Sequence, residues 1–239
     1  MSERDARPQP GAASEYAVAS EGDARARLFV ALLLDADVCA ALAAWAQASL
    51  GGEPGSGGGR LPGSGRVRLL DAEALHLTLC FLGSVPLSAT DAIGGALDDV
   101  VAASVGDPPV LSPAEVRWLP PRRPRVCALA LHDHGERAGA LQAAVSERLR
   151  AGGWYTPERR RWLPHVTVAR VARGERAGRV EGPGRSERAG QAEGPGRSER
   201  GDRVSGSAPP RLGPFPATAV ALMRSWPGSR YEPLVRVAL

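Results

Sequence analysis

The chain has 239 residues, a formal net charge of +4 and a hydrophobic content of 43%, which is enough to build a core. All 30 basic residues are arginines, and the small net charge excludes a nucleic-acid binder of the histone type. The 29 glycines and 21 prolines are unevenly spread and exceed what a compact domain of this size needs. We therefore expect part of the chain to lie outside the folded domain.

The cysteines and the N-terminus bear on where the protein works. Cys39, Cys80 and Cys127 lie in apolar stretches without a C-x-x-C spacing, which is typical of free core thiols in a reducing compartment. The N-terminus has no charged start followed by a long apolar run, and no stretch reaches the ~18 apolar residues of a membrane span. We therefore expect a soluble, cytoplasmic protein without a membrane partner. The oligomeric state stays open, and a monomer is the default expectation.

In chain order, residues 1–25 show no apolar period and predict a disordered tail before a single domain at 26–239. The apolar run at 27–34 favours a central strand, and Asp35 can cap the Ala-rich helix that follows it. The further elements predicted are a Gly-rich loop at 51–65, strands at 66–70 and 75–82, a helix from a capping box at Ser88 and Asp91 to about Ser104, strands near 115–119 and 126–132, a helix at 136–151, a strand at 164–172, and a hairpin of strands 217–226 and 231–238 joined at Pro227-Gly228.

A low-complexity insertion interrupts the domain at about 173–210. The segment EGPGRSER occurs at 181–188 and again at 193–200. Two repeats without apolar residues cannot bury a core, so we reject a solenoid and predict a disordered insertion of mixed charge. An arginine arm that contacts RNA is the alternative interpretation.

One four-residue pattern, His-x-Thr-x with apolar x, occurs twice, as HLTL at 76–79 and as HVTV at 165–168. A strand places residues i and i+2 on one face, so each tetrad would point a histidine and a threonine the same way and its apolar residues into the core. Two such strands facing one cleft would place two imidazoles and two hydroxyls around a small anion. The pattern predicts acid–base chemistry on a phosphate.

Four segments of the chain, taken in sequence order, resemble those of the 2H phosphoesterases, and in particular of their RNA 2′,3′-cyclic phosphodiesterases, once described as 2′-5′ RNA ligases. These segments are RLFVALLL, HLTLCFLG, LPHVTVAR and LMRSWPGSRYEPL. The resemblance covers about 27–172 and 212–239. It implies an α+β fold of two pseudo-symmetric lobes, each an antiparallel sheet backed by helices, that face a central cleft. It also implies hydrolysis of 2′,3′-cyclic phosphates at RNA or nucleotide ends to 2′-phosphates, without a metal or another cofactor.

Opening a cyclic phosphate requires a base for the attacking water and an acid for the leaving oxygen. We assign His165 as the base and His76 as the acid, and the opposite order stays open. Thr78 and Thr167 would donate hydrogen bonds to the non-bridging oxygens.

The resemblance also implies a positive or aromatic residue near the second tetrad and in the C-terminal hairpin. Position 163, which some relatives fill with arginine, is Leu163 here. Arg161 shares the strand parity of His165 and is our candidate for a substrate contact, whereas Arg170 has the opposite parity. Tyr231 is our candidate for stacking on a base or bonding the phosphate, and packing within the hairpin is its alternative.

Three other functions remain open. A non-catalytic module of the same fold would bind nucleotides or RNA, and the same site could slowly join RNA ends through a 2′-5′ bond. A metal-dependent hydrolase could use His76, His165 and a carboxylate, although the tetrads lack H-x-H and H-E-x-x-H spacings. His132 and His134 also suggest a metal cluster, but no further ligand is near them in the sequence, and we expect both to be exposed.

Overall fold

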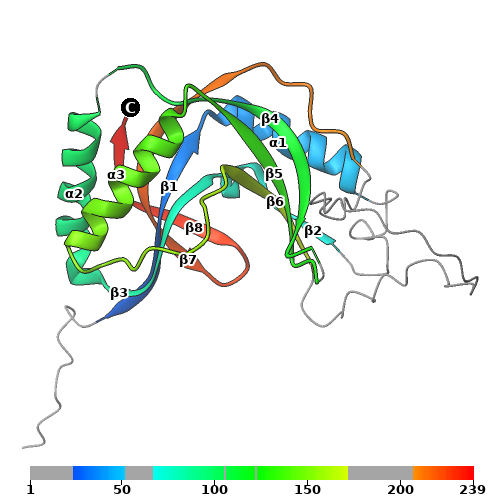
Figure 1. Ribbon diagram of the computed structural model, residues 1–239. Helices are drawn as coiled ribbons and strands as arrows, with labels where there is room; N and C mark the ends of the chain where they lie inside the picture. Colours follow the sequence, from blue (N-terminus) through cyan, green and yellow to red (C-terminus); the bar gives the residue numbers. More distant parts are fainter. Residues whose placement is uncertain (1–23, 52–66, 105, 122, 172–206) are drawn as a thin grey trace, which may run out of the picture.

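The computed structural model describes residues 24–51, 67–104, 106–121, 123–171 and 207–239 (Figure 1). The expected N-terminal tail, the Gly-rich loop and the repeat insertion fall almost wholly outside these ranges, so the predictions about them remain predictions.

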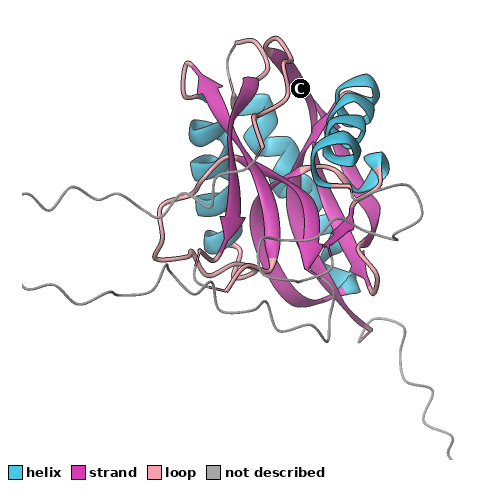
Figure 2. Ribbon diagram, turned by 90° about the vertical axis from the view of Figure 1, so that its right-hand side faces the viewer, coloured by secondary structure: helices cyan, strands magenta, loops and turns pink. Residues whose placement is uncertain are grey.

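In the described ranges eight strands form one antiparallel sheet, and seven of them follow the order β1-β3-β6-β5-β4-β7-β8. An additional pairing of β1 with β7 closes it into a barrel, and β2 pairs with β6 outside this path. The three α-helices of the described residues pack around the sheet, which gives the expected α+β fold (Figures 1 and 2). The strands are β1 (Arg25–Leu34), β2 (Val67–Leu69), β3 (Leu77–Pro86), β4 (Val110–Leu119), β5 (Val126–His134), β6 (His165–Val171), β7 (Phe215–Trp226) and β8 (Arg230–Ala238), and the helices are α1 (Ala36–Leu50), α2 (Thr90–Ala103) and α3 (Arg137–Ala151).

The two lobes are arranged symmetrically about the pair β3 and β6, which carry the two tetrads. Beyond β3 lie β1 and then β7, and beyond β6 lie β5 and then β4. In each lobe a helix connects strands of the sheet: α1 follows β1 and leads through β2 to β3 in one lobe, and α3 lies between β5 and β6 in the other. The pseudo-symmetric halves implied by the resemblance are thus present, and their strands join in one continuous sheet.

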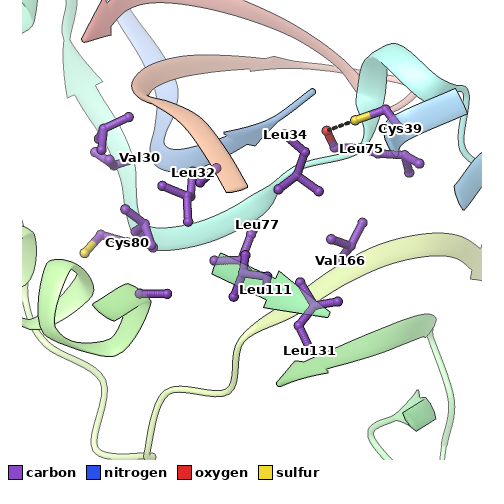
Figure 3. Packing of buried hydrophobic residues seen from close by; sticks show 14 of the residues in the cluster. Val30, Leu32, Leu34, Cys39, Leu75, Leu77, Cys80, Leu111, Leu131 and Val166 are labelled. Atoms are coloured by element: carbon purple, nitrogen blue, oxygen red, sulfur yellow. Dashed lines mark hydrogen bonds between the residues drawn. The ribbon is translucent and has the colours of Figure 1, made fainter. Parts of the chain in front are cut away.

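Helices bury one face of the sheet. The helix α1 packs against β2 and β6, whereas α2 and α3 lie side by side, with α2 against β7 and β8 and α3 against β3 and β5 (Figure 1). No helix in the described ranges is both long and apolar enough to cross a membrane. The core side chains that Figure 3 draws between the strands include Val30, Leu32, Leu77, Leu111, Leu131 and Val166.

All three cysteines are buried free thiols, as expected. Burial raises the pKa of Cys39 to about 11 and the pKa values of Cys80 and Cys127 to about 12. A thiol that keeps its proton at neutral pH is a poor nucleophile, so these cysteines serve as core residues.

The starts of α1 and α2 test the two helix caps that were predicted from the sequence. At α1 the Asp35 carboxylate accepts a hydrogen bond from the Asp37 N–H at 2.8 Å, which confirms the predicted cap. The capping box predicted at Ser88 is wrong, because Ser88 lies in a 3₁₀ turn, Leu87–Ala89, that leads directly into α2. The Thr90 N–H there donates to the Leu87 carbonyl, so the backbone of the turn supplies the acceptor.

Candidate active site

The two tetrad histidines have the same local environment at the starts of two neighbouring strands. His165 is the first residue of β6, and His76 immediately precedes β3. The His76 Nδ1 lies 2.9 Å from the Ala74 carbonyl oxygen, and the His165 Nδ1 lies 2.8 Å from that of Leu163. A carbonyl oxygen only accepts, so each Nδ1 carries a proton and donates it. In a neutral ring this leaves Nε2 as the free acceptor.

The pairing of β3 with β6 brings the two tetrads together. Leu77 and Val166 are opposite each other in this antiparallel pair, and both are fully buried. Their neighbours along the strands therefore point to the other face of the sheet, which we call the histidine face. Side chains that are opposite in an antiparallel pair have Cβ atoms about 4.5–5.5 Å apart. Continuing the register by one residue in each direction sets His76 opposite Thr167 and Thr78 opposite His165.

Small side chains flank these four residues on the histidine face. Alanines on β1 and β5, all of them buried, stand opposite three of the four. A methyl group rises little above the sheet, so the flanks leave room for a ligand over the histidines. The pairs are Ala31 with Thr78, Ala128 with Thr167 and Ala130 with His165.

The surroundings of His76 keep its ring neutral. Burial, above all, lowers the pKa of His76 to about 4; the hydrogen bond to Ala74 opposes this lowering, and electrostatic repulsion from Arg170 and His165 adds to it. At neutral pH the uncharged ring can accept a proton at Nε2. This favours His76 as the base. From the sequence we preferred His165 as the base and left the assignment to His76 open.

Arg170 reaches the histidine face, contrary to the parity expected from the sequence. In the β5–β6 ladder Cys127 pairs with Ala169 and Ala128 pairs with Thr167, so Val168 is an extra residue on β6. Such a β-bulge shifts the alternation by one residue. Val168 and Ala169 are both fully buried, and Arg170 therefore falls on the same face as Thr167. Sequence parity missed it because a bulge needs no particular residue type.

Tyr231 stands between His76 and Arg170. Its ring meets the His76 imidazole edge-on, with centroids 4.9 Å apart and planes at 85°, and its hydroxyl accepts a hydrogen bond from Arg170 Nη2 at 3.2 Å. Phe29 packs against both rings, 4.9 Å from that of His76 and 5.3 Å from that of Tyr231. The structure thus places Tyr231 in the site, and its contact with substrate stays a prediction.

Arg170 keeps one donor for a ligand. Its Nε is buried and has no hydrogen-bond partner among the described residues. A buried donor without a partner costs about 1–3 kcal/mol, and most buried polar groups in folded proteins are paired. An oxyanion beside His76 would supply the acceptor that this donor lacks.

Arg161 lies in the loop before β6, and its side chain is exposed. Because this loop is not a strand, the shared parity with His165 does not determine where Arg161 points, and its role stays a prediction. The loop itself is held to the first lobe, since the Trp162 indole donates to the Thr78 carbonyl at 3.0 Å.

His132 and His134 lie at the end of β5, with ring centroids 4.5 Å apart. His132 is exposed as expected, whereas His134 is half-buried and its Nε2 lies 2.9 Å from Ser112 Oγ. In the part of the chain that the structure describes, no three potential metal-ligating side chains gather at one place.

Solved structures of similar fold cover nearly the whole chain. Escherichia coli LigT complexed with 3′-AMP matches with a TM-score of 0.59 and 22% identity, over 90% of this chain and 99% of that chain. A crystal structure described as a phosphoesterase matches with a TM-score of 0.59 and 21% identity, over 90% and 99% of the two chains. TT0787 of Thermus thermophilus matches with a TM-score of 0.51 and 24% identity, over 89% and 97%.

By sequence, the chain matches no described protein family and no curated protein. At 21–24% identity the structural likeness establishes the fold. The chain has the fold of the LigT-like 2H phosphoesterases.

Proposed function

We propose that the chain is an RNA 2′,3′-cyclic phosphodiesterase that opens cyclic phosphate ends of RNA or nucleotides and leaves 2′-phosphates. The observation that carries the proposal is the pairing of Leu77 with Val166 between β3 and β6. Continued by one residue in each direction, this register sets each tetrad histidine opposite the threonine of the other tetrad. The site thus offers two groups that transfer protons, next to hydroxyl and guanidinium donors that bind oxyanions. The likeness to LigT, solved with 3′-AMP, supports a nucleotide as the ligand.

Hydrolysis at this site needs two proton transfers. His76 Nε2 takes a proton from a water molecule while the water oxygen attacks phosphorus. The bond from phosphorus to the 3′ oxygen breaks, and protonated His165 gives its Nε2 proton to that oxygen. The products are a 2′-phosphate monoester and a 3′-hydroxyl, and proton exchange with solvent restores the two histidines. Each transfer contributes about 10²–10⁴-fold to the rate.

Three donors stabilise the negative charge that builds on phosphorus-bound oxygens. Thr78 and Thr167 lie diagonally across the β3–β6 pair, so their hydroxyls approach the phosphate from two sides. Arg170 adds a permanent positive charge, and its unpaired Nε would donate to a non-bridging oxygen. Donors that are held in place before the reaction stabilise the transition state without a cost of reorganisation.

The electrostatics of the free site support the order of the two histidines. Because the pKa of His76 is lowered to about 4, its ring is neutral at pH 7, which the role of base requires before the proton is taken. A protonated His165 then has to be the acid. The charge of Arg170 disfavours a second cation on His76 and so preserves this order.

The experiment is turnover of 2′,3′-cyclic AMP in the presence of EDTA by the wild type and by His76→Ala and His165→Ala. We expect the wild type to produce 2′-AMP, identified by phosphorus NMR, and each variant to lose at least about 10²-fold in kcat/KM. Nucleotide binding without turnover by the folded wild type would contradict the proposal and favour a non-catalytic binding module. Turnover that EDTA abolishes would favour a metal-dependent hydrolase.

A further inference from the structure

An aromatic side chain is exposed beside the site. Phe81 is 61% exposed, and it is the only large hydrophobic residue that the described ranges leave exposed. In the β1–β3 ladder Phe29 pairs with Phe81 and Ala31 pairs with Thr78. Phe81 therefore lies on the histidine face, two strand positions from Thr78. Its ring centroid is 5.9 Å from that of Phe29, which in turn packs against His76.

The distance from Thr78 to Phe81 suits a nucleoside. Ala31 and Phe29, their partners on β1, are two residues apart, which corresponds to about 7 Å along a strand. A base attached to the ribose of the reacting phosphate lies within this reach. Phe29 is buried beside Phe81 on the neighbouring strand, and its ring supports that of Phe81 from one side. The exposed ring is thus held in place next to where the base would lie.

The same face becomes positively charged further along β1. Arg27 is exposed, lies two residues before Phe29 on the same face, and pairs with Ser84. Among the described residues Arg27 forms no ion pair. Arg25 follows on this face and donates from Nε to Ser84 Oγ at 3.2 Å. From Ala31 to Arg27 the strand advances about 13 Å, which is longer than a mononucleotide bound at the histidines can span.

We propose that this track, formed by Phe81, Arg27 and Arg25, binds the single-stranded RNA that leads to the cyclic phosphate end. The base of the terminal nucleotide stacks on Phe81, and a phosphate further along the RNA pairs with Arg27. Aromatic platforms followed by positive charges are how proteins bind single strands without reading their sequence. The inference rests on the proposed function and names its substrate as an oligonucleotide.

Three variants and two substrates test the track. Phe81→Leu keeps an apolar contact with Phe29 but removes the aromatic face, and Arg27→Gln removes the charge. Arg150→Gln is the matched control, because it removes the same charge from the last turn of α3, where Arg150 pairs with Glu147. The substrates are 2′,3′-cyclic AMP and a trinucleotide that ends in a 2′,3′-cyclic phosphate, and thermal unfolding of each variant verifies its fold.

The substitutions at Phe81 and Arg27 should affect the two substrates differently. Phe81→Leu should lower kcat/KM by about 5–150-fold on both substrates, since stacking on an aromatic ring contributes about 1–3 kcal/mol per base. Arg27→Gln should lower kcat/KM on the trinucleotide alone and reduce the slope of log kcat/KM against log salt by about 0.7, the value for one phosphate contact. Arg150→Gln should resemble the wild type on both substrates.

Two other results would distinguish a failure of the track from a failure of the proposed function. If the wild type turns over both substrates and neither Phe81→Leu nor Arg27→Gln differs from it, the track is wrong and the proposed function stands. If the wild type turns over neither substrate, the proposed function fails, and binding of a 3′-phosphorylated trinucleotide is then measured by fluorescence anisotropy. Weaker binding by both variants would support the track in that case, and unchanged binding would overturn it.

Discussion

Replacing His76 with glutamine should remove a pH dependence of stability that the fold imposes. The pKa of His76 falls from an ordinary value of 6.5 to about 4 in the folded state. The folded protein therefore binds this proton less readily than the unfolded chain does between these two values. The contribution of His76 to the free energy of unfolding is fully present above pH 6.5 and is lost as the pH falls toward 4. A gap of about 2.5 pKa units corresponds to about 3 kcal/mol in total.

Urea unfolding of the wild type and of His76→Gln at pH 7.0, 5.5 and 4.5 measures this loss. Relative to pH 7.0, the wild type should lose about 1 kcal/mol more than the variant at pH 5.5 and about 2 kcal/mol more at pH 4.5. His132→Gln, which removes an exposed imidazole from β5, is the matched control for the substitution itself. Parallel stability curves for the wild type and His76→Gln would refute the claim that the site keeps His76 neutral.

Three further predictions concern the residues around His76. Arg170→Gln should lower kcat/KM for 2′,3′-cyclic AMP by about 10²–10³-fold, as expected for a lost oxyanion donor, and NMR titration of the His76 ring should show a higher pKa because a positive charge is gone. Thr167→Ala should lower kcat by about 10²-fold, whereas Thr167→Ser should retain most of the activity, because only the hydroxyl is required; steady-state kinetics of the two variants distinguishes this role from packing. Leu77→Ala should destabilise the protein by about 2–5 kcal/mol in urea unfolding, because a fully buried side chain at the β3–β6 pair leaves a cavity.

Local sequence patterns predicted the elements of the site because both tetrads lie where strands begin. Apolar residues at alternate positions, such as Leu77 and Val166, identify the buried face, and the histidines and threonines between them identify the other face. The pairing of β3 with β6 was not predicted: the resemblance implied two lobes that face a central cleft, and the residues by themselves do not say which strands are neighbours. The order of acid and base depends on burial and on nearby charges, which strand parity does not reveal.

β-Bulges explain why strict alternation of side chains along a strand assigned Arg170 to the wrong face of the sheet and missed Phe81. The extra Val168 on β6 turns Arg170 toward the histidines, although strict alternation places it on the opposite face. On β3, the register shift at Leu79 brings Phe81 to the same face as Thr78, whereas alternation would bury it with Leu77. Bulges occur with many residue types and are common next to functional sites, so the sequence held no signal for either residue.

The most direct test of the two-histidine mechanism compares the activity of the histidine variants on 2′,3′-cyclic AMP with their activity on a substrate whose leaving group needs no acid. A 2′-deoxynucleoside p-nitrophenyl phosphodiester releases nitrophenolate without protonation. His165→Ala should lose about 10²–10⁴-fold in kcat/KM on 2′,3′-cyclic AMP but less than about 10-fold on this diester, whereas His76→Ala should lose heavily on both. The opposite pattern would make His76 the acid, and equal losses by both variants on both substrates would contradict separate acid and base roles.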